Sequence, residues 1–323
     1  MNVALHPIDS KIPNLALMKL STYHKQRGDT VKFFNDWAIT PDIVYCSVVF
    51  SWNKQQALGL ESAYSNTKFI YGGSGVDLSK SLDDIDTNIE HLKPDYSLYN
   101  IDYSMGFLTR GCIRECEFCI VRKKEGLLKA HSPLDEFLDP SHNKVILLDN
   151  NLLAYKEHKT ILKDLVQRGL KVDFNQGLDI RLLTEETASL LANVKYYGHP
   201  EFKQKTLRFS FDDMKYRTAV EQGIQRLLNT GIKSSNIFFY VLAYPNAVRD
   251  AVERVEILKS YKVVPFVMKF NKASTPQLNK LAHWVNHIPY YQCFTFDEYD
   301  MNRTGRHKHK KKIKDLNNQC RLS

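Results

Sequence analysis

The chain has 323 residues, of which 43% are hydrophobic and 25% charged, and its formal net charge is +9. This composition is ordinary for a globular protein, and the length suits two domains or one large barrel with additions. No run of 18 apolar residues occurs, and the first residues lack the pattern of a signal peptide. We therefore expect a cytoplasmic protein that has no membrane-spanning helix.

The first 90 residues alternate between strand-like and helix-like segments, which predicts a small Rossmann-like α/β domain. Residues 14–27 have apolar residues at helical spacing and end before Gly28. Residues 76–100 are polar and acidic, and we predict a linker there. The predicted strands of the domain are 2–5, 30–34, 43–50 and 69–71.

Residues 91–270 contain six strand–helix units in series, which predicts a partial (β/α)6 barrel with its chemistry at the carboxyl ends of the strands. The predicted strands are 104–109, 144–149, 171–175, 206–211, 236–242 and 262–268. The predicted helices are 154–168, 184–193, 214–230 and 246–260. Residues 271–300 add a helix at 275–287 and an aromatic segment.

Residues 301–323 form a basic tail. Residues 303–314 carry seven Lys or Arg and no acid, which leaves a net charge of +2 for the rest of the chain. Runs of like charge are usually disordered, so we expect a solvated tail. The alternative is contact between the tail and the phosphate backbone of a nucleic acid.

Three of the six cysteines lie within eight residues, as Cys112-Ile-Arg-Glu-Cys116-Glu-Phe-Cys119. A loop with this C-x3-C-x2-C spacing can hold three irons of a cube and leave the fourth iron open to a small molecule. This hypothesis requires the three sulfurs to share one metal cube without a fourth protein ligand. The alternatives are a structural zinc site, which normally needs four ligands, a redox-active pair made by Cys116 and Cys119, and a chance cluster.

The pattern C-x3-C-x-aromatic-C, with Phe118 before the last cysteine, resembles the signature of the radical S-adenosylmethionine superfamily. The resemblance covers residues 100–270. It implies a [4Fe–4S] cluster on Cys112, Cys116 and Cys119, and S-adenosylmethionine on the fourth iron. It also implies reductive cleavage of S-adenosylmethionine to a 5′-deoxyadenosyl radical, and a reducing partner such as flavodoxin or ferredoxin.

The same resemblance implies contacts to S-adenosylmethionine at the strand ends. They are Phe118 against the adenine, the backbone at Asp149, Asn150 and Asn151 against the methionine amino group, Arg181 against the methionine carboxylate, Ser210 or Asp212 at the ribose hydroxyls, and Gln176 and Leu242 within the third-strand and fifth-strand motifs. Asp149-Asn150-Asn151 stands where the family usually has Gly-Gly-Glu. The alternatives are core packing for Phe118, a surface salt bridge for Arg181 and strand-end capping for Ser210 and Asp212.

Residues 1–90 resemble the cobalamin-binding domain that precedes many radical enzymes of this type, on segments 13–23, 28–31, 41–49 and 71–73. The glycines that follow a strand suggest close approach of the backbone to a ligand. The domain is short, however, and lacks the Asp-x-His-x-x-Gly loop of an axial histidine, since His6 is followed by Pro7 and Ile8. Cobalamin binding is left open, and the alternative is an α/β domain that packs on the barrel or helps to bind substrate.

The substrate is not specified by the sequence. Aromatic and basic residues after 280 suit a nucleic-acid base as substrate, and they equally suit a helix that closes the barrel. Cys46, Cys293 and Cys320 are scattered, so we expect no second cluster. The rival hypothesis is a non-catalytic metal-binding or nucleic-acid-binding protein that acts through the basic tail.

Overall fold

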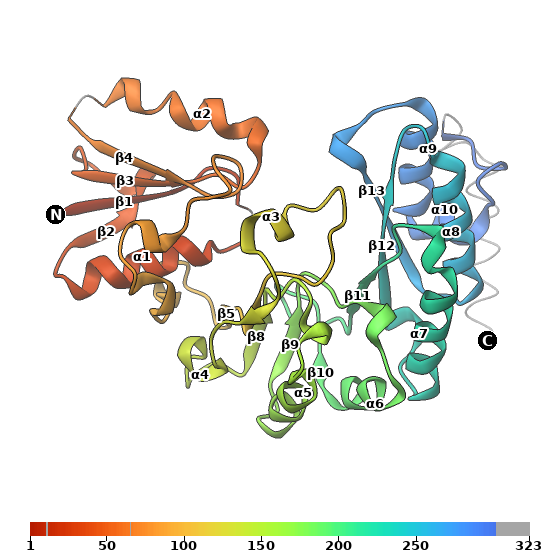
Figure 1. Cartoon of the computed structure of the whole chain (residues 1–323). Helices are drawn as coiled ribbons and strands as arrows, with labels where there is room; N and C mark the ends of the chain where they lie inside the picture. The colour runs from red at the N-terminus through yellow and green to blue at the C-terminus, as the bar shows by residue number, and fades with distance from the viewer. Residues whose placement is uncertain (11, 65, 302–323) are drawn as a thin grey trace. The chain divides into compact units, whose positions relative to one another are not determined.

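The computed structural model describes residues 1–10, 12–64 and 66–301, and it divides the chain into two compact units (Figure 1). The first unit comprises residues 1–158 and 167–176, and the second comprises residues 159–166 and the chain from 177 onward. The basic tail after Met301 lies outside the described residues. Among the described helices, none has the length and apolar character needed to cross a membrane.

The first unit begins with a parallel four-stranded sheet in the order β2-β1-β3-β4. Its strands are β1 (Asn2–Pro7), β2 (Thr30–Phe33), β3 (Ile43–Ser47) and β4 (Lys68–Gly72). Helices α1 (Leu15–Gln26) and α2 (Lys54–Leu58) lie on opposite faces of the sheet (Figure 1). The direction of the strand order reverses between β1 and β3, which is the arrangement of a doubly wound sheet.

Local chemistry defines α1 and the core around it. The side chain of Asn14 accepts a hydrogen bond from the Leu17 amide and begins the helix, and Gly28 (φ 80°) follows its end. Apolar residues on one face of the sheet pack with α1, and a smaller set lies on the other face. The first set is Val3, Leu5, Leu17, Leu20, Ile43, Tyr45 and Ile89, and the second is Ala4, Val44 and Cys46.

The segment 76–100 is packed against the first domain, so the prediction of a linker is wrong. Ile89 is fully buried in the same core as Leu17. The acidic residues form specific hydrogen bonds. Asp84 forms a capping box with Ser81, and Asp95 accepts hydrogen bonds from Ser21 and Lys25 of α1. Their polarity hid the packing from the sequence pattern. Three 3-10 helices occur here, η4 (Leu82–Asp84), η5 (Ile89–His91) and η6 (Tyr96–Leu98).

A second parallel sheet follows, in which β8 (Lys144–Leu147) lies between β5 (Ser104–Gly106) and β9 (Lys171–Phe174). The single strand predicted at 104–109 is split in two. The chain leaves the parallel ladder after Gly106, and β6 (Thr109–Arg110) then pairs antiparallel with β7 (Lys129–Ala130). The connecting helices are α3 (Val121–Glu125), α4 (Leu134–Phe137), η7 (Leu152–Ala154) and α5 (His158–Gln167).

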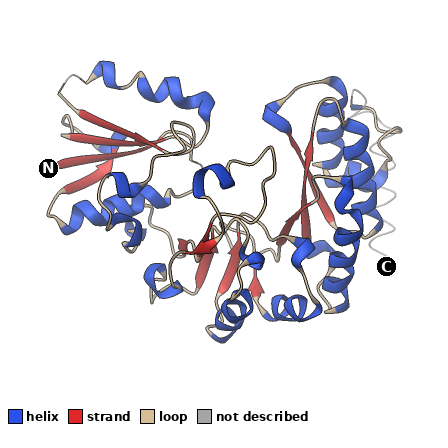
Figure 2. Cartoon of the chain, viewed as in Figure 1, coloured by secondary structure: helices blue, strands red, loops and turns tan. Residues whose placement is uncertain are grey.

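The second unit contains a parallel sheet in the order β11-β12-β13, with its helices α7, α8 and α9 on one side (Figure 2). Burial alternates along β12, as expected for a strand with one covered face. Its strands are β11 (Leu207–Ser210), β12 (Ile237–Ala243) and β13 (Val264–Lys269), and the short strand β10 (Lys195–Tyr196) is not part of this sheet. The helices are α6 (Glu185–Asn193), α7 (Arg217–Asn229), α8 (Val248–Ser260), α9 (Pro276–Val285) and α10 (Ile288–Cys293).

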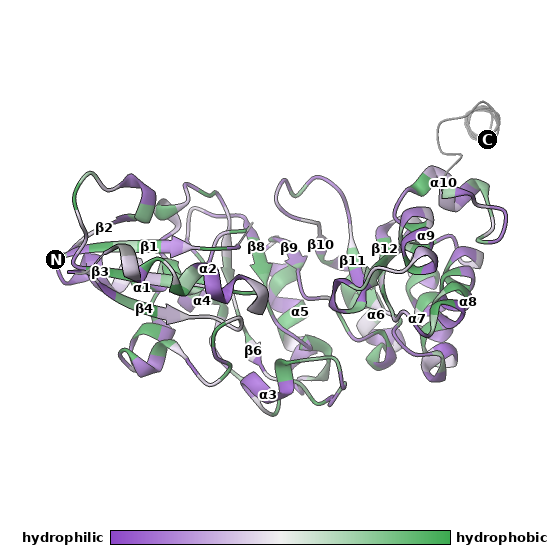
Figure 3. Ribbon diagram, turned by 90° about the horizontal axis from the view of Figure 1, so that it is seen from above, coloured by the Kyte–Doolittle hydropathy of each residue, from purple (hydrophilic) through white to green (hydrophobic). Residues whose placement is uncertain are grey.

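The helices α7 and α8 carry hydrophobic and hydrophilic residues in alternation along the ribbon (Figure 3), as expected for helices that bury one face. The remaining 3-10 helices are η1 (Phe34–Asp36), η2 (Ser51–Asn53), η3 (Glu61–Ala63), η8 (Ile180–Leu182), η9 (Met214–Tyr216), η10 (Ser234–Asn236) and η11 (Phe270–Lys272).

The parallel α/β architecture confirms the predicted α/β fold class. The partial barrel and the predicted domain bounds stay predictions.

Arg254 on α8 ties together the carboxyl ends of β11 and β12. Its buried guanidinium donates hydrogen bonds to the carbonyl oxygens of Phe211 (2.6 Å) and Leu242 (3.0 Å). The substitution Arg254→Ala leaves these acceptors without partners, so we expect the free energy of unfolding to fall by about 2–4 kcal/mol in chemical denaturation. Arg249→Ala, at an exposed ion pair on the same helix, is the control and should leave stability unchanged. Equal effects would contradict this account.

Candidate functional site

The three cysteines lie on a loop at the carboxyl end of the second sheet, as predicted. This cysteine loop, residues 111–120, leaves β6 and returns through α3 to β7. The pairs Thr109↔Ala130 and Arg110↔Lys129 hold the two ends of the excursion together. A short antiparallel hairpin therefore forms the base of the loop.

Gly111 is required where the loop begins. Its φ is +84°, and a Cβ atom there would lie 2.3 Å from the carbonyl oxygen of Leu127. This close approach lets the amide of Cys112 donate a hydrogen bond to the carbonyl oxygen of Gly126 at 3.3 Å. The first cysteine is thereby fixed next to the chain that leaves the loop.

The cysteines are half-buried thiols and not disulfides. The Sγ atom of Cys112 accepts hydrogen bonds from the Arg114 amide at 3.4 Å and from Asn151 Nδ2 at 3.5 Å. The amide of Cys119 donates to the carbonyl oxygen of Cys116 at 2.9 Å. N–H donors directed at a sulfur stabilise a thiolate and tune an iron–sulfur cluster.

The predicted gathering of the three sulfurs around one metal is not seen. Within residues 1–10, 12–64 and 66–301, no group of three or more His, Cys, Asp or Glu side chains is placed to hold a metal ion. The donor set nevertheless fits a [4Fe–4S] cluster chemically, because three thiols lie on one loop and N–H groups already point at a sulfur. Binding a cluster would require the loop to bring its sulfurs together.

Asp149, Asn150 and Asn151 all turn their side chains to the segment that carries the cysteine loop. The carboxylate of Asp149 accepts hydrogen bonds from the Thr109 amide (2.6 Å), the Thr109 hydroxyl (2.7 Å) and the Leu108 amide (3.3 Å). Burial raises the pKa of Asp149 to about 6, although these hydrogen bonds act to lower it. The side chains of all three residues are thus engaged within the chain, and contact of their backbone with a methionine amino group stays a prediction.

Glu125 is a residue of the site that the sequence did not reveal. Its Oε2 atom accepts hydrogen bonds from the Gly111 amide at 3.0 Å and from Asn150 Nδ2 at 2.8 Å. Arg110 Nε lies 3.7 Å from the same oxygen. No motif marks Glu125, because its partners Gly111 and Asn150 lie 14 and 25 residues away in the sequence.

Phe118 and Gln176 are both exposed. The side chain of Phe118 is 41% exposed, so the alternative that it is an ordinary core aromatic is wrong. Its ring has surface available for a ligand. The amide nitrogen of Gln176 donates to Asn175 Oδ1 at 3.3 Å.

In the second unit, Arg181 already has a carboxylate partner. Its Nε and Nη2 atoms donate to the two carboxylate oxygens of Asp179 at 2.6 and 2.9 Å. The guanidinium also lies over the ring of Tyr216, 4.3 Å from its centroid. This arrangement is the salt bridge that was the alternative for Arg181, in a partly buried form.

Ser210, Asp212 and Leu242 come together at the carboxyl ends of β11 and β12. Asp212 Oδ1 accepts a hydrogen bond from the Leu242 amide at 2.9 Å. Burial raises the pKa of Asp212, while hydrogen bonds from Leu242 and Ser210 oppose the shift. The geometry is that of strand-end capping, which was the alternative for these residues.

The carboxyl edge of the first sheet is closed by the chain itself. Asp9 accepts hydrogen bonds from the amides of Val49 and Phe50 at 2.8 and 2.9 Å. A Cβ atom on Gly73 would lie 2.3 Å from the Val48 carbonyl oxygen, and one on Gly75 would lie 2.7 Å from the Phe50 backbone. These glycines therefore permit close contact between backbone segments at this edge, and approach of a ligand there stays a prediction.

Comparison with known proteins gives a likeness among solved structures. No family model matches the sequence, and no curated protein matches it. Among solved structures, the cobalamin-dependent S-adenosylmethionine radical enzyme OxsB, solved with aqua-cobalamin and S-adenosylmethionine bound, is similar with a TM-score of 0.52 and 14% identity. The alignment covers 93% of this chain and 56% of that chain.

The likeness shows the fold. The chain spans little more than half the length of that enzyme. At this level of identity, the α/β fold of a radical S-adenosylmethionine enzyme is what the comparison supports.

The buried carboxylate of Asp149 predicts a pH-dependent stability difference. Because its pKa is about 6 in the folded chain and lower in the unfolded chain, the folded state gains stability as the pH falls from 7 to 4. The free energy of unfolding of the natural chain relative to Asp149→Asn should therefore rise by up to about 3 kcal/mol over that range.

The control is Asp135→Asn, since Arg168 lowers the pKa of the exposed Asp135 carboxyl. The difference in free energy of unfolding between the natural chain and Asp135→Asn should show no such rise. Urea denaturation at each pH measures the difference, and a constant difference for Asp149→Asn would contradict the buried-charge account.

Proposed function

We propose that this chain is a radical S-adenosylmethionine enzyme in which Cys112, Cys116 and Cys119 hold a [4Fe–4S] cluster. One observation carries the proposal: three thiols share a loop at the carboxyl edge of a parallel sheet, in a chain whose fold is similar to that of an enzyme of this class. When bound, such a cluster supplies the electron that cleaves S-adenosylmethionine.

The residues of the chain would hold and orient this cofactor. The hairpin base, Gly111 and Glu125 fix the first cysteine, and Asn151 donates to its sulfur. The backbone at 149–151 is the proposed contact for the methionine amino group, and the exposed ring of Phe118 is the proposed contact for the adenine. The guanidinium of Arg181 is already paired with both carboxylate oxygens of Asp179. The geometry therefore does not support the predicted contact between Arg181 and the methionine carboxylate.

The proposal requires a one-electron donor such as flavodoxin or ferredoxin. Helix α3, directly after the cysteine loop, carries Arg122, Lys123 and Lys124, and Lys123 is exposed. An acidic electron carrier would be attracted to this charge. Cobalamin is not part of the proposal, because the domain lacks the Asp-x-His-x-x-Gly loop that would supply an axial histidine.

Replacement of the loop cysteines tests the proposal. After anaerobic reconstitution, the natural chain should hold about four irons and show broad absorbance near 400 nm. The triple variant Cys112→Ser, Cys116→Ser, Cys119→Ser should lose both, because a thiolate is the ligand that iron–sulfur clusters take. Cys293→Ser, outside the loop, is the control and should keep both.

Formation of 5′-deoxyadenosine separates the proposal from its rival. The reduced natural chain should release it from S-adenosylmethionine. Iron binding without 5′-deoxyadenosine, together with salt-dependent RNA binding, would favour the non-catalytic protein. A chain that binds no iron would also contradict the proposal.

We further propose that the substrate presents a planar ring, as a nucleic-acid base does. On the sheet of the second unit, the rings of Phe238, Tyr240 and Phe266 gather with centroids 5.0–6.3 Å apart. Phe266 is 40% exposed and the neighbouring Met268 is 44% exposed. Arg208 pairs with Phe238 across the strands and shares their face. Sheets that present aromatic rings in this way stack bases.

Removal of the exposed ring tests this part. Phe266→Ala should weaken binding of mixed-sequence single-stranded RNA by about tenfold, the loss expected for one stacked base. Ile288→Ala, which removes an apolar side chain of α10 that is 52% exposed, should not change binding. Deletion of residues 303–323 separates the contribution of the tail. Loss of binding on deletion, with Phe266→Ala unchanged, would favour the tail as the binding element.

A further inference from the structure

A partly buried carboxylate, that of Glu90, lies between the N-terminal domain and the cysteine loop. Glu90 follows Ile89, which is fully buried in the core of the first sheet, so its backbone belongs to the packed N-terminal domain. Its side chain is 17% exposed. Nothing in the proposed chemistry requires a carboxylate at this place.

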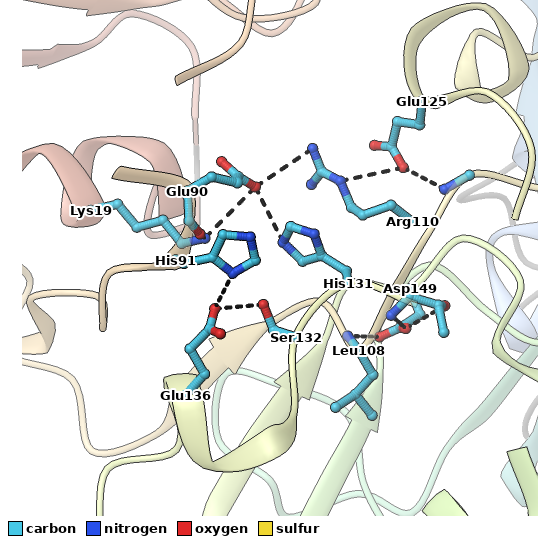
Figure 4. A network of polar contacts seen from close by, with 12 residues as sticks. Lys19, Glu90, His91, Leu108, Arg110, Glu125, His131, Ser132, Glu136 and Asp149 are labelled. Carbon is cyan, nitrogen blue, oxygen red and sulfur yellow. Dashed lines mark hydrogen bonds and ion pairs between the residues drawn. The ribbon is translucent and has the colours of Figure 1, made fainter. Parts of the chain in front are cut away.

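Three cationic or basic groups surround Glu90 (Figure 4). From its Oε1 atom, His131 Nε2 lies at 3.3 Å, Lys19 Nζ at 3.7 Å and Arg110 Nη2 at 3.9 Å. Lys19 also donates to the backbone carbonyl of Glu90. Burial raises the pKa of Glu90, but His131, Lys19 and Arg110 outweigh it and hold the pKa at about 2. Glu90 therefore remains charged and balances buried positive charge.

Arg110 carries this interaction to the cysteine loop. One edge of its guanidinium faces Glu90, and its Nε atom lies 3.7 Å from Glu125 Oε2 (Figure 4). The guanidinium stacks on Phe107 at 4.1 Å, which restricts its orientation. Glu125 in turn accepts the hydrogen bond from the Gly111 amide, directly before Cys112.

We propose that Glu90 is a positioning residue that fixes the cysteine loop to the N-terminal domain through Arg110 and Glu125. The Glu90 network, consisting of Lys19, Glu90, Arg110, Glu125 and His131, is a continuous path from α1 to the backbone at the first cysteine. Removing the charge of Glu90 leaves Lys19 and Arg110 without their shared counter-ion, so Arg110 loses its fixed place and the loop opens more often. The importance of this path for a cluster rests on the proposed function, whereas the path itself does not.

A neighbouring carboxylate provides a matched control. Glu136 accepts hydrogen bonds from His91 at 2.9 Å and Ser132 at 2.6 Å, close to Glu90 (Figure 4). Within the described part of the chain, the hydrogen-bond partners of the Glu136 carboxylate are His91 and Ser132, and neither Arg110 nor the cysteine loop is among them. The same substitution at Glu136 therefore removes a carboxylate charge nearby without interrupting the path.

The test measures how fast iodoacetamide alkylates each thiol of the full-length chain without iron, by mass spectrometry under native conditions. Glu90→Gln should speed alkylation of Cys112, Cys116 and Cys119 by about fivefold or more, which corresponds to loss of one buried polar partner. Glu136→Gln should leave these rates unchanged. Cys46 is the internal reference, because burial raises the pKa of its thiol to about 12 and it reacts on global unfolding.

Unchanged loop rates in Glu90→Gln would overturn the proposal, and so would a parallel rise at Cys46, which would make Glu90 a general stability residue. Arg110→Lys is the second variant. It keeps the charge that faces Glu90 but loses the guanidinium edge that faces Glu125, so the loop rates alone should rise. Equal rates for Arg110→Lys and the natural chain would contradict the path.

Iron binding distinguishes failure of this proposal from failure of the proposed function. If the natural chain binds no iron while Glu90→Gln still speeds loop alkylation, the cluster proposal fails and the positioning role stands. If the natural chain binds iron and Glu90→Gln alkylates at the natural rate, the cluster proposal stands and the positioning role fails.

Discussion

The carboxylate of Asp149, at the end of β8, accepts hydrogen bonds from two backbone amides and a hydroxyl of the chain that leads into the cysteine loop. Burial opposes its charge, so the folded chain keeps the carboxylate there only because these donors surround it. They fix Thr109 at the carboxyl edge of the sheet. The pairing of β6 with β7, and with it the base of the cysteine loop, follows from that position.

The edge of the second sheet is thus organised around the loop before any cofactor is considered. Asn150 reaches Glu125, Asn151 reaches the sulfur of Cys112, and Glu125 holds the Gly111 amide. These residues follow β8, and they support a loop that follows the neighbouring strand β5 in the chain. The two lie close together because the carboxyl ends of parallel strands meet at one edge of the sheet. The loop is held firmly at its base, whereas its three sulfurs are not gathered as a metal site in the described chain.

The N-terminal domain has the strand order of a ligand-binding doubly wound sheet, yet its edge is filled by Asp9 and by the backbone around Gly73. Polar and ionic contacts connect this domain to the segments that flank the cysteine loop. Lys124 on α3 donates to Ser74 at 2.7 Å, and Glu90 faces Arg110. These contacts support the loop from the side of the domain.

Apolar periodicity gave the longer strands and helices of both units to within a few residues, since it reflects which face of each element is buried. It did not give the short elements α2, α3, α4, α10, β7 and β10. Gly28, Gly169 and Gly231 marked helix ends because each has a positive φ. The cysteine spacing gave the loop. Only the tertiary structure decided the rest: the packing of Ile89, the hairpin under the loop, and the partners of Asp149, Glu125 and Glu90. Those partners lie up to 71 residues apart in sequence, so no local pattern contains them.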